Sequence, residues 1–420
     1  MADTLIVKIL RNRSGGTPLQ AGDIAVCDVD LAAIIDIQFS HDRFGDITAI
    51  HDPARVAIVM DHAVPAPSIR DAESGKTARA FAAAHGITKF FDVGRHGIVH
   101  QVLAEQGLVR PGMVVACTDS HTCAAGAVGA AARGLGPAEV LQIVCTGRTW
   151  YQVPPTVRYE LTGAPHEWVN GKDVFLHVAA EYGAATSQCV EFGGPGLDQL
   201  PMTDRRTIAT QGAEIGADFT LFPADDICLD YVRSAAPDAE LSPLAADRGA
   251  EYADVRPLDL GRVSPMVARP GTVINNAGPV EQLAGTRVDQ AFIGSCANGQ
   301  LADLEVAARI LRGRQVAATT RLIVTPASQR IYQQASRLGY LADLAEAGAT
   351  ITNPTCGACF GYHMGLVAAG ETCITASTRN FRGRMGSPDA SIFMASPATV
   401  AASALQGAIA DVRELEGIRP

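Results

Sequence analysis

Three cysteines stand where a soft metal centre could be bound. Cys356 and Cys359 form a C-x-x-C spacing within the glycine-bearing stretch Asn353–Gly361, and Cys296 follows a different apolar segment. Three thiolates on two strand ends can hold such a centre and leave one coordination position open. A C-x-x-C pair alone is equally typical of a redox dithiol or of a structural zinc site. The sequence therefore indicates thiol or metal chemistry at these two loops.

Paired acids and histidines follow two other apolar segments. Asp61 and His62 come directly after one run, and Asp119, Ser120 and His121 come directly after another. A carboxylate that orients an imidazole is typical of general acid–base catalysis. Each pair taken alone is also consistent with a capping aspartate beside a surface histidine. Because the arrangement occurs twice, we interpret these residues as catalytic.

Four further residues are candidates for the same chemistry. His100 lies between the two acid–histidine pairs and is expected near the start of a helix. Glu191 stands on an apolar strand before two glycines, where it could partner a histidine or simply lie at a sheet edge. Arg379 and Arg384 follow the apolar segment that begins at Cys373. Guanidinium groups near thiolates suggest an anionic ligand held against a metal centre.

Strands and helices alternate in the part of the chain that carries the thiols. Apolar runs and helical periodicities predict strands at 288–293, 322–325, 350–352 and 373–377, with helices over 301–311 and 331–344. This alternation is typical of parallel βαβ units, whose ligands bind beyond the carboxyl ends of the strands. We therefore expect the three thiols and the two arginines to lie at one rim of a sheet.

The remaining patterns predict an α/β protein with three domains. The expected boundaries are 1–154, carrying the Asp–His pairs, 155–275, carrying Glu191, and 276–420, carrying the thiols. Strands are expected at 24–26, 56–60 and 113–117 in the first of these. Residues 262–285 are rich in proline, glycine and asparagine and show little periodicity, so we interpret them as a linker.

Composition limits the class of protein. The 420 residues are 47% hydrophobic and 19% charged, which is ordinary for a soluble globular enzyme. A formal net charge of −10 argues against nucleic-acid and anionic-membrane partners. Apolar runs are too short for a membrane span, and the first residues lack a signal-sequence pattern. Ten dispersed cysteines predict thiols in a reducing compartment, so we expect a cytoplasmic protein.

Several motifs, in order and spread over essentially the whole chain, resemble the aconitase superfamily. Within it they are most similar to the large subunits of two-subunit isopropylmalate isomerases and homoaconitases. The motifs are Thr118–Thr122, Gly147–Trp150 with Val153–Pro154, Gly212–Ala217, Gly294–Cys296, Asn353–Cys359 and Arg379–Arg384.

The resemblance implies α/β domains with mostly parallel sheets around a 4Fe-4S cluster held by Cys296, Cys356 and Cys359. The open iron would act as a Lewis acid on a substrate hydroxyl. Arg379 and Arg384 would clamp a substrate carboxylate and orient the site. The resemblance also pairs each histidine with one carboxylate: His62 with Asp61, His100 with Asp119, and His121 with Glu191.

The reaction implied by the resemblance is dehydration of a hydroxy di- or tricarboxylic acid to an alkene, followed by rehydration with the opposite regiochemistry. We expect interconversion of 3-isopropylmalate and 2-isopropylmalate. The alternatives are homocitrate, citrate or a substituted malate of the dimethylmalate or phosphonomethylmalate type. From other classes, a zinc-binding structural protein or an RNA-binding relative is the alternative. Departures from the family pattern bear on the substrate: the single residues are Thr210, Ala297, Gln300 and Thr378, and the stretch 35–40 is also atypical.

A second polypeptide is expected. In the family, a proton-abstracting serine and a further substrate-binding arginine lie in a domain that follows the cluster domain. Only 36 residues follow Arg384, and domains rarely fall below about 50 residues. The sequence therefore predicts a heterodimer with a small subunit of the swivelling-domain type that supplies the serine and the substrate specificity.

Overall fold

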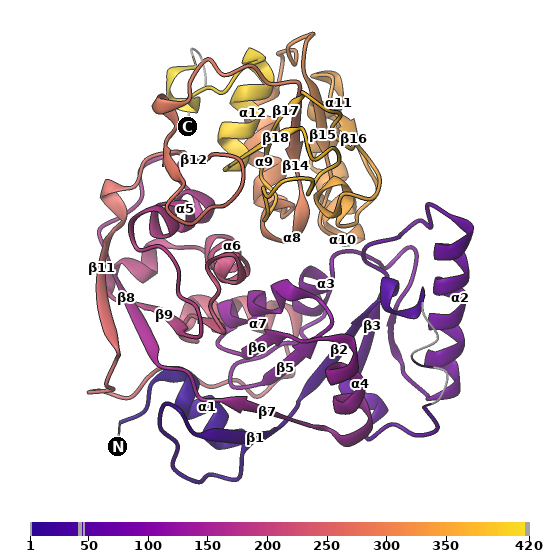
Figure 1. Cartoon of the computed structure of the whole chain (residues 1–420), viewed down its shortest axis with the longest axis vertical. Helices are drawn as coiled ribbons and strands as arrows, with labels where there is room; N and C mark the ends of the chain where they lie inside the picture. Colours follow the sequence, from indigo (N-terminus) through magenta and orange to yellow (C-terminus); the bar gives the residue numbers. More distant parts are fainter. Residues whose placement is uncertain (1, 41–43, 45–46, 416–420) are drawn as a thin grey trace. The chain divides into compact units, whose positions relative to one another are not determined.

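The structure is a computed structural model that describes residues 2–40, 44 and 47–415 (Figure 1). The chain forms two compact units, which are described separately. Unit 1 comprises Met1–Gly163 with Ala185–Leu258, and unit 2 comprises Ala164–Ala184 with Asp259–Pro420. Helices flank sheets of mostly parallel strands in both units. The α/β fold class predicted from the sequence is confirmed.

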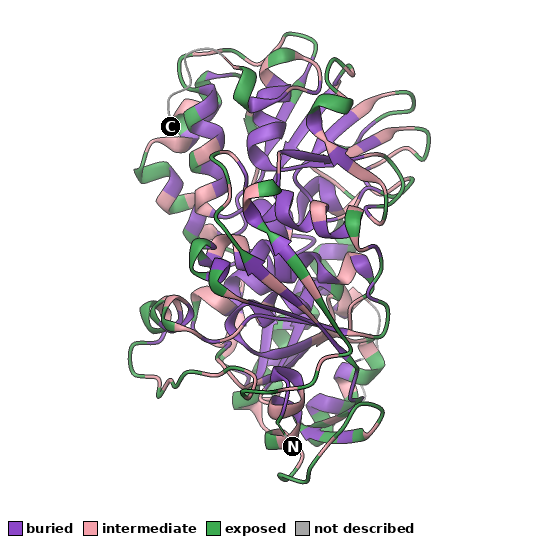
Figure 2. Ribbon diagram, turned by 90° about the vertical axis from the view of Figure 1, so that its left-hand side faces the viewer, coloured by how far each residue is buried: buried purple, intermediate pink, exposed green. Residues whose placement is uncertain are grey.

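The described part of unit 1 contains a five-stranded sheet whose neighbouring strands all run parallel. In the spatial order β4-β3-β2-β5-β6, its strands are Lys89–Phe91, Val56–Val59, Leu31–Ile35, Val114–Cys117 and Ala131–Gly134. Every residue of the three central strands is buried. Figure 2 colours the ribbon by burial, with buried residues in purple. A parallel sheet covered on both faces requires continuous apolar runs, and two of these runs are the strands predicted at 56–60 and 113–117.

Two smaller sheets complete the strands of unit 1. Strand β1 (Ile24–Asp28) pairs antiparallel with β7 (Arg148–Gln152). The second sheet has the order β10-β9-β8-β11, with Phe219–Leu221, Cys189–Gly193, Thr156–Thr162 and Asp254–Asp259 as its strands. Neighbouring strands β10, β9 and β8 run parallel.

The helices of unit 1 alternate with these strands along the chain. The α-helices are α1 (Leu5–Arg13), α2 (Ile69–Ala84), α3 (Val99–Glu105), α4 (Pro137–Thr146), α6 (Met202–Gln211) and α7 (Asp226–Ala235). The 3-10 helices are η1 (Asp36–Ser40), η2 (Pro53–Arg55), η3 (Ser120–Val128), η4 (Pro195–Gln199) and η5 (Gly212–Ile215). The long 3-10 helix η3 packs against α6, β6 and β10, so it lies at the centre of the unit.

Unit 2 is built on a seven-stranded sheet with the order β13-β12-β18-β17-β14-β15-β16. Its strands are Ala277–Pro279, Met266–Ala268, Ser391–Ala395, Thr372–Thr375, Gln290–Ile293, Arg321–Val324 and Thr350–Ile351. From β18 to β16 the neighbours run parallel, whereas β12 pairs antiparallel with both β13 and β18. The four strands predicted around the thiols are all present in the parallel part.

The helices of unit 2 cover this sheet. The α-helices are α5 (Gly171–Glu181), α8 (Ser295–Asn298), α9 (Leu301–Leu311), α10 (Gln329–Arg337), α11 (Tyr340–Glu346) and α12 (Pro397–Gln406). The 3-10 helices are η6 (Leu260–Arg262), η7 (Val280–Gln282), η8 (Gly357–Phe360) and η9 (Val412–Glu414). Helix α12 packs on β14 and α9, and α5 packs on β12 and β13.

Two predictions about unit 2 are wrong. The stretch 262–285 is not a linker, because β12 and β13 lie in it and extend the sheet at one edge. The helix predicted over 331–344 is two helices, α10 and α11. They are separated at Gly339, which has a φ of +83°. Residues with a side chain rarely adopt this left-handed backbone conformation, whereas glycine does so readily.

The predicted division into three domains stays a prediction. The five-stranded sheet lies within 1–154, and nearly all of the seven-stranded sheet lies within 276–420. Strand β12, however, belongs to that sheet although it precedes residue 276. Within the described residues, no helix is both long enough and apolar enough to cross a membrane.

Gly126 generates a prediction about stability. A Cβ at this position of η3 would lie 1.7 Å from the backbone oxygen of Thr220 in β10, so Gly126→Ala must force two buried elements apart. We expect a loss of at least about 3 kcal/mol in the free energy of unfolding, measured by denaturant titration.

Gly75→Ala is the matched control. The added methyl in α2 would meet the flexible end of Met60 at 3.2 Å, and alanine favours the helix. The stability of this variant should stay within about 1 kcal/mol of the wild type. Equal stability of Gly126→Ala and Gly75→Ala would contradict the close packing of η3 on β10.

Candidate active site

Unit 1 gathers three histidines around one carboxylate, and we call His62, His100, His121 and Asp119 the histidine cluster. His62 follows the carboxyl end of β3, and Asp119 and His121 follow the carboxyl end of β5. His100 lies in the first turn of α3, which begins at Val99. Parallel strands end at one edge of their sheet, which brings these separate segments together.

Asp119 is the centre of the histidine cluster. Its Oδ1 lies 2.8 Å from Nε2 of His100 and also accepts a hydrogen bond from the backbone N–H of His121 at 2.8 Å. Its Oδ2 lies 3.7 Å from Nε2 of His62, and Nδ1 of His121 lies 3.7 Å from Oδ1. The expected pairing of His100 with Asp119 matches this geometry.

Burial and hydrogen bonding set the charges in the histidine cluster. Burial alone would raise the pKa of Asp119, but hydrogen bonds from His100 and His121 bring this pKa well below its usual range. Burial lowers the pKa of His100, and the nearby Asp119 opposes this only in part. At neutral pH the site therefore holds an ionised carboxylate beside a neutral imidazole. Such a pair can take up or release a proton without leaving an uncompensated charge.

Asp61 contacts two elements of the histidine cluster. Its Oδ1 lies 3.4 Å from Nδ1 of His62, which agrees with the expected pairing. Its Oδ2 accepts the backbone N–H of Val99 at 2.9 Å, at the start of the helix that carries His100. One buried carboxylate therefore positions His62 directly and α3 through its first turn.

Asp36 supports the Asp61–His62 turn, a role that the sequence interpretation missed. Its buried carboxylate accepts the backbone N–H groups of His62 at 3.0 Å and Ala63 at 2.7 Å. The carbonyl of Asp36 accepts the hydroxyl of Ser74 from α2 at 2.9 Å. An aspartate directly after a buried strand was the available signal, but such residues are common in turns.

The expected pairing of His121 with Glu191 is wrong. Nε2 of His121 lies 2.8 Å from Oε1 of Glu214, which stands in η5. The buried carboxylate of Glu191 instead accepts hydrogen bonds from the backbone N–H of Leu5, from Arg158 and from the hydroxyl of Tyr252. These three distances are 3.0, 3.0 and 2.7 Å. Glu191 therefore ties α1 to its neighbouring strands, whereas Glu214 contacts the imidazole.

Ser120 is exposed at the start of η3. It stands between Asp119 and His121, and Asp119 accepts the backbone N–H of His121 across it. The structure therefore places Ser120 at the surface of the histidine cluster, with its backbone fixed by its neighbours.

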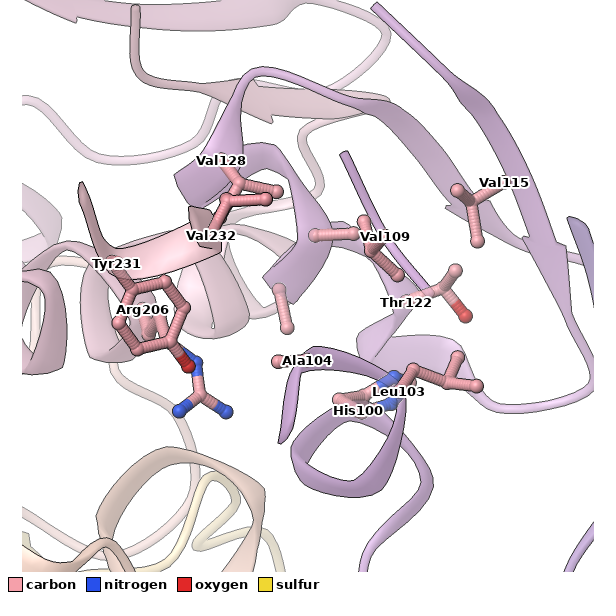
Figure 3. A pocket seen from close by; sticks show the side chains of 12 residues that line it. His100, Leu103, Ala104, Val109, Val115, Thr122, Val128, Arg206, Tyr231 and Val232 are labelled. Atoms are coloured by element: carbon pink, nitrogen blue, oxygen red, sulfur yellow. The ribbon is translucent and has the colours of Figure 1, made fainter. Parts of the chain in front are cut away.

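A small cavity of about 20 Å³ lies behind His100, which is room for about one water molecule (Figure 3). Apolar side chains line most of it, and Arg206 and Tyr231 close one side with the guanidinium 5.9 Å from the ring centroid. Nη2 of Arg206 donates to Oε1 of Gln101 at 2.6 Å, next to His100 in α3.

Unit 2 gathers three cysteines, and we call Cys296, Cys356 and Cys359 the thiol cluster. Cys296 lies in α8 after β14, and the other two follow β16 at the start of η8. The hydroxyl of Ser295 lies 3.7 Å from Sγ of Cys296 and 3.3 Å from Sγ of Cys359. Cys356 and Cys359 hydrogen-bond each other. The predicted convergence of the three thiols on one edge of the sheet is therefore present in the structure.

Positive charge accompanies the thiol cluster. Nη2 of Arg384 lies 3.8 Å from Sγ of Cys359. Burial acts to lower the pKa of Arg384, but the charges of Cys359, Cys356 and Cys296 outweigh it and raise this pKa. The pKa of Cys359 lies well below its usual range, first because of the hydrogen bond from Cys356 and, against burial, because of Arg384. Cys359 therefore favours the thiolate form.

The residues of the thiol cluster fit an anionic multi-iron cluster better than a single metal ion. Among the described residues, no group of three or more His, Cys, Asp and Glu side chains is spaced to hold one ion. Nε of Arg384 is buried and has no hydrogen-bond partner within the described part of the chain. A donor set of three thiols with one open side is typical of an iron–sulfur site. Arg379 is half-buried on the same loop as Arg384.

Comparison with known proteins identifies the class. A family model described as aconitase family (aconitate hydratase) matches residues 37–277 and 271–407. The solved structure of aconitase X from Thermococcus kodakaraensis matches with a TM-score of 0.50 at 13% identity, covering 89% of this chain and 88% of that one. This second likeness shows the fold alone. The chain belongs to the aconitase family, as its motifs predicted, and membership of this family implies an iron–sulfur cluster.

Similar proteins narrow the comparison further. The 3-isopropylmalate dehydratase large subunit of Mycolicibacterium smegmatis is 58% identical over 99% of this chain and 98% of its own length. The 3-isopropylmalate dehydratase large subunit 1 of Methanopyrus kandleri is 42% identical over 98% of this chain and 99% of its own length. A probable methanogen homoaconitase large subunit of Methanothermobacter thermautotrophicus is 40% identical over 98% of this chain and 97% of its own length.

Glu191 and Glu214 give a prediction that distinguishes a structural role from a catalytic one. Glu191→Gln removes a buried charge facing Arg158, so the free energy of unfolding should fall by about 2 kcal/mol. Glu214→Gln should leave stability nearly unchanged but should lower turnover of the assembled enzyme by on the order of 10²-fold, because His121 loses its carboxylate. Thermal unfolding and initial rates measure the two effects. The opposite assignment of effects would restore Glu191 as the partner of His121.

Proposed function

We propose that this chain is the large subunit of a 3-isopropylmalate dehydratase, a hydro-lyase that interconverts 3-isopropylmalate and 2-isopropylmalate through an alkene. The observation that carries the proposal is the 58% identity with the large subunit from M. smegmatis, which extends over 99% of this chain. The three converging thiols and the histidine cluster agree with it, because the reaction requires an electrophile for a hydroxyl and groups that move protons.

In this proposal Cys296, Cys356 and Cys359 hold a 4Fe-4S cluster. When bound, the cluster supplies a Lewis acid that polarises the hydroxyl of the substrate. Arg384 offsets the negative charge of the thiolates and stays close to Cys359, as its distance of 3.8 Å indicates. Arg379 binds a substrate carboxylate, for which the planar guanidinium is well suited.

The proton-handling roles belong to the histidine cluster. His100 and His121 share Asp119, which keeps a negative charge at the site and orients His100 through Nε2. His62, held between Asp61 and Asp119, protonates the departing hydroxyl. Ser120 and His121 order the water that adds back, and Glu214 takes the position beside His121 that had been expected for Glu191.

Homoaconitase chemistry is the second candidate, because one relative of that name is 40% identical over 98% of the chain. The four residues that depart from the family pattern bear on this choice. Gln300 caps α9, and its Nε2 donates to the carbonyl of Ala297 at 3.2 Å. Thr210 donates to the carbonyl of Arg206 at 2.6 Å, whereas Thr378 lies 3.8 Å from Sγ of Cys359. Thr378 is therefore the departure whose hydroxyl lies near the sulfur of a proposed ligand, while Ala297 directly follows the proposed ligand Cys296.

A small subunit of the swivelling-domain type completes the proposed enzyme in the cytoplasm. The relatives with 58% and 42% identity are both named large subunits. The partner supplies the proton-abstracting serine and determines which side chain of the hydroxy acid is accepted.

The ligand assignment predicts the effect of single cysteine changes. Cys296→Ser, Cys356→Ser and Cys359→Ser should each lose most of the iron, because each removes one of three protein thiolates. Iron and sulfide content after anaerobic reconstitution, together with visible absorbance, measures this loss. Cys145→Ser, at an exposed position of α4, is the matched control and should keep its iron. Full iron content in any of the first three variants would remove that residue from the ligand set.

The substrate and partner are tested together. The reconstituted chain should show no turnover of 3-isopropylmalate alone, and coexpression with a small subunit of the family should restore it. Formation of the alkene is followed by ultraviolet absorbance over a panel of isopropylmalate, homocitrate, citrate and dimethylmalate. Turnover of homocitrate above that of isopropylmalate would select the second candidate, and full turnover without any partner would refute the heterodimer.

A further inference from the structure

Lys172 is a fully buried cation to which no role has been assigned above. It stands in the first turn of α5, and its side chain is 0% exposed. Burying an ammonium group is costly unless the group finds strong hydrogen-bond acceptors. The partners of this ammonium therefore show what its position achieves.

The ammonium of Lys172 meets the end of strand β17. Nζ donates to the backbone carbonyl of Ser377 at 2.8 Å and lies 3.9 Å from Sδ of Met394 in β18. The helix that carries it is fixed at its start. The side chain of Asn170 accepts the backbone N–H of Lys172 at 2.9 Å, and Oδ1 of Asp173 accepts the N–H of Met266 at 2.8 Å.

The carbonyl that Lys172 contacts belongs to the same peptide group as the N–H of Thr378. A peptide group is planar and nearly always trans, so its C=O and N–H point in opposite directions. The N–H of Thr378 hydrogen-bonds Sγ of Cys359, and the hydroxyl of Thr378 lies 3.8 Å from the same sulfur. One rigid peptide thus joins the ammonium of Lys172 to the thiol of Cys359.

We propose that Lys172 is a positioning residue that acts on Cys359 through the Ser377–Thr378 peptide. By holding the carbonyl, the ammonium fixes the direction of the N–H on the opposite side of the plane. The positive charge also polarises the peptide, which strengthens the N–H···S hydrogen bond. Arg379 directly follows this peptide, so the same contact fixes the start of the arginine loop.

The inference rests on the proposed function in one respect, because it takes Cys359 as a cluster ligand. Hydrogen bonds to the ligand sulfurs and nearby positive charge stabilise the reduced, more negative state of an iron–sulfur cluster. They also hold the ligand in place when the cluster is challenged by oxygen. Removal of the ammonium should weaken both effects.

The central experiment compares Lys172→Met with the wild type in the assembled, reconstituted enzyme. Methionine is close in length to lysine but lacks the charge and the donors. The variant should lose iron in air about 10-fold faster, as for other changes beside metal ligands. Its one-electron reduction potential should shift to more negative values. Lys76→Met, an exposed lysine of α2, is the matched control and should match the wild type in both measurements.

A second measurement needs no cluster. Hydrogen exchange by mass spectrometry of the cluster-free chain should show about 10-fold faster exchange in the 377–380 segment of Lys172→Met. Exchange in β14 should be unchanged, which separates local positioning from general loosening. Lys172→Gln keeps a neutral donor and should give an intermediate exchange rate.

The possible outcomes are distinct. Wild-type rates of iron loss and of hydrogen exchange in Lys172→Met would overturn the inference. Failure of both Lys172→Met and Lys172→Gln to fold would also overturn it, because Lys172 would then serve stability alone. A wild-type chain that takes up no iron would refute the proposed function instead. The exchange experiment would still decide whether Lys172 positions the peptide.

Discussion

The chemistry of unit 1 depends on keeping one carboxylate ionised inside the protein. Asp119 is half-buried among His62, His100 and His121, and hydrogen bonds from imidazoles and from a backbone N–H stabilise its charge. The parallel sheet makes this possible, because its strands end at one edge and deliver the residues from distant parts of the sequence. Without the carboxylate, the three imidazoles would have no common partner to orient them.

In unit 2 the groups that need compensating charge are thiols, and the compensating group is a guanidinium. Its three thiols converge near Arg384, which helps to hold the pKa of Cys359 well below its usual range, and the strand ends that carry them follow the same topological rule. Nζ of Lys172 donates a hydrogen bond to the backbone carbonyl of Ser377, at the end of strand β17. Each unit therefore compensates a concentrated charge with groups from neighbouring strand ends and from the first turn of a helix.

The sequence was sufficient to predict strands β3 and β5 and the four strands that precede or surround the thiols. Continuous apolar runs such as 56–60 and 113–117 indicated buried strands, and the C-x-x-C loop follows the short strand β16. The failures have a common physical cause. Strands β12 and β13 span only three residues each, too few to show a periodicity, and β13 is an edge strand, where proline and glycine are tolerated.

The sequence also did not predict which residues contact each other across long distances in the chain. Glu214 stands 93 residues from His121 in a short 3-10 helix. The motif Gly212–Ala217 contains it and was the available signal, but the motif alone does not say which histidine Glu214 contacts. Asp36 and Lys172 resemble ordinary turn and helix-start residues, because their importance lies in which distant backbone groups they contact. Polar networks of this kind follow from packing, which single-sequence patterns do not encode.

Asp61 has a consequence for how this protein responds to acid. One of its oxygens faces His62, and the other accepts a backbone hydrogen bond from the helix turn that carries His100. Asp61 therefore couples the two histidines through its charge and through its hydrogen bond to the helix. Protonation of one changes the surroundings of the other through Asp61 and through Asp119. The apparent pKa values in a pH–rate profile would therefore belong to the network as a whole, and no single inflection could be assigned to one imidazole.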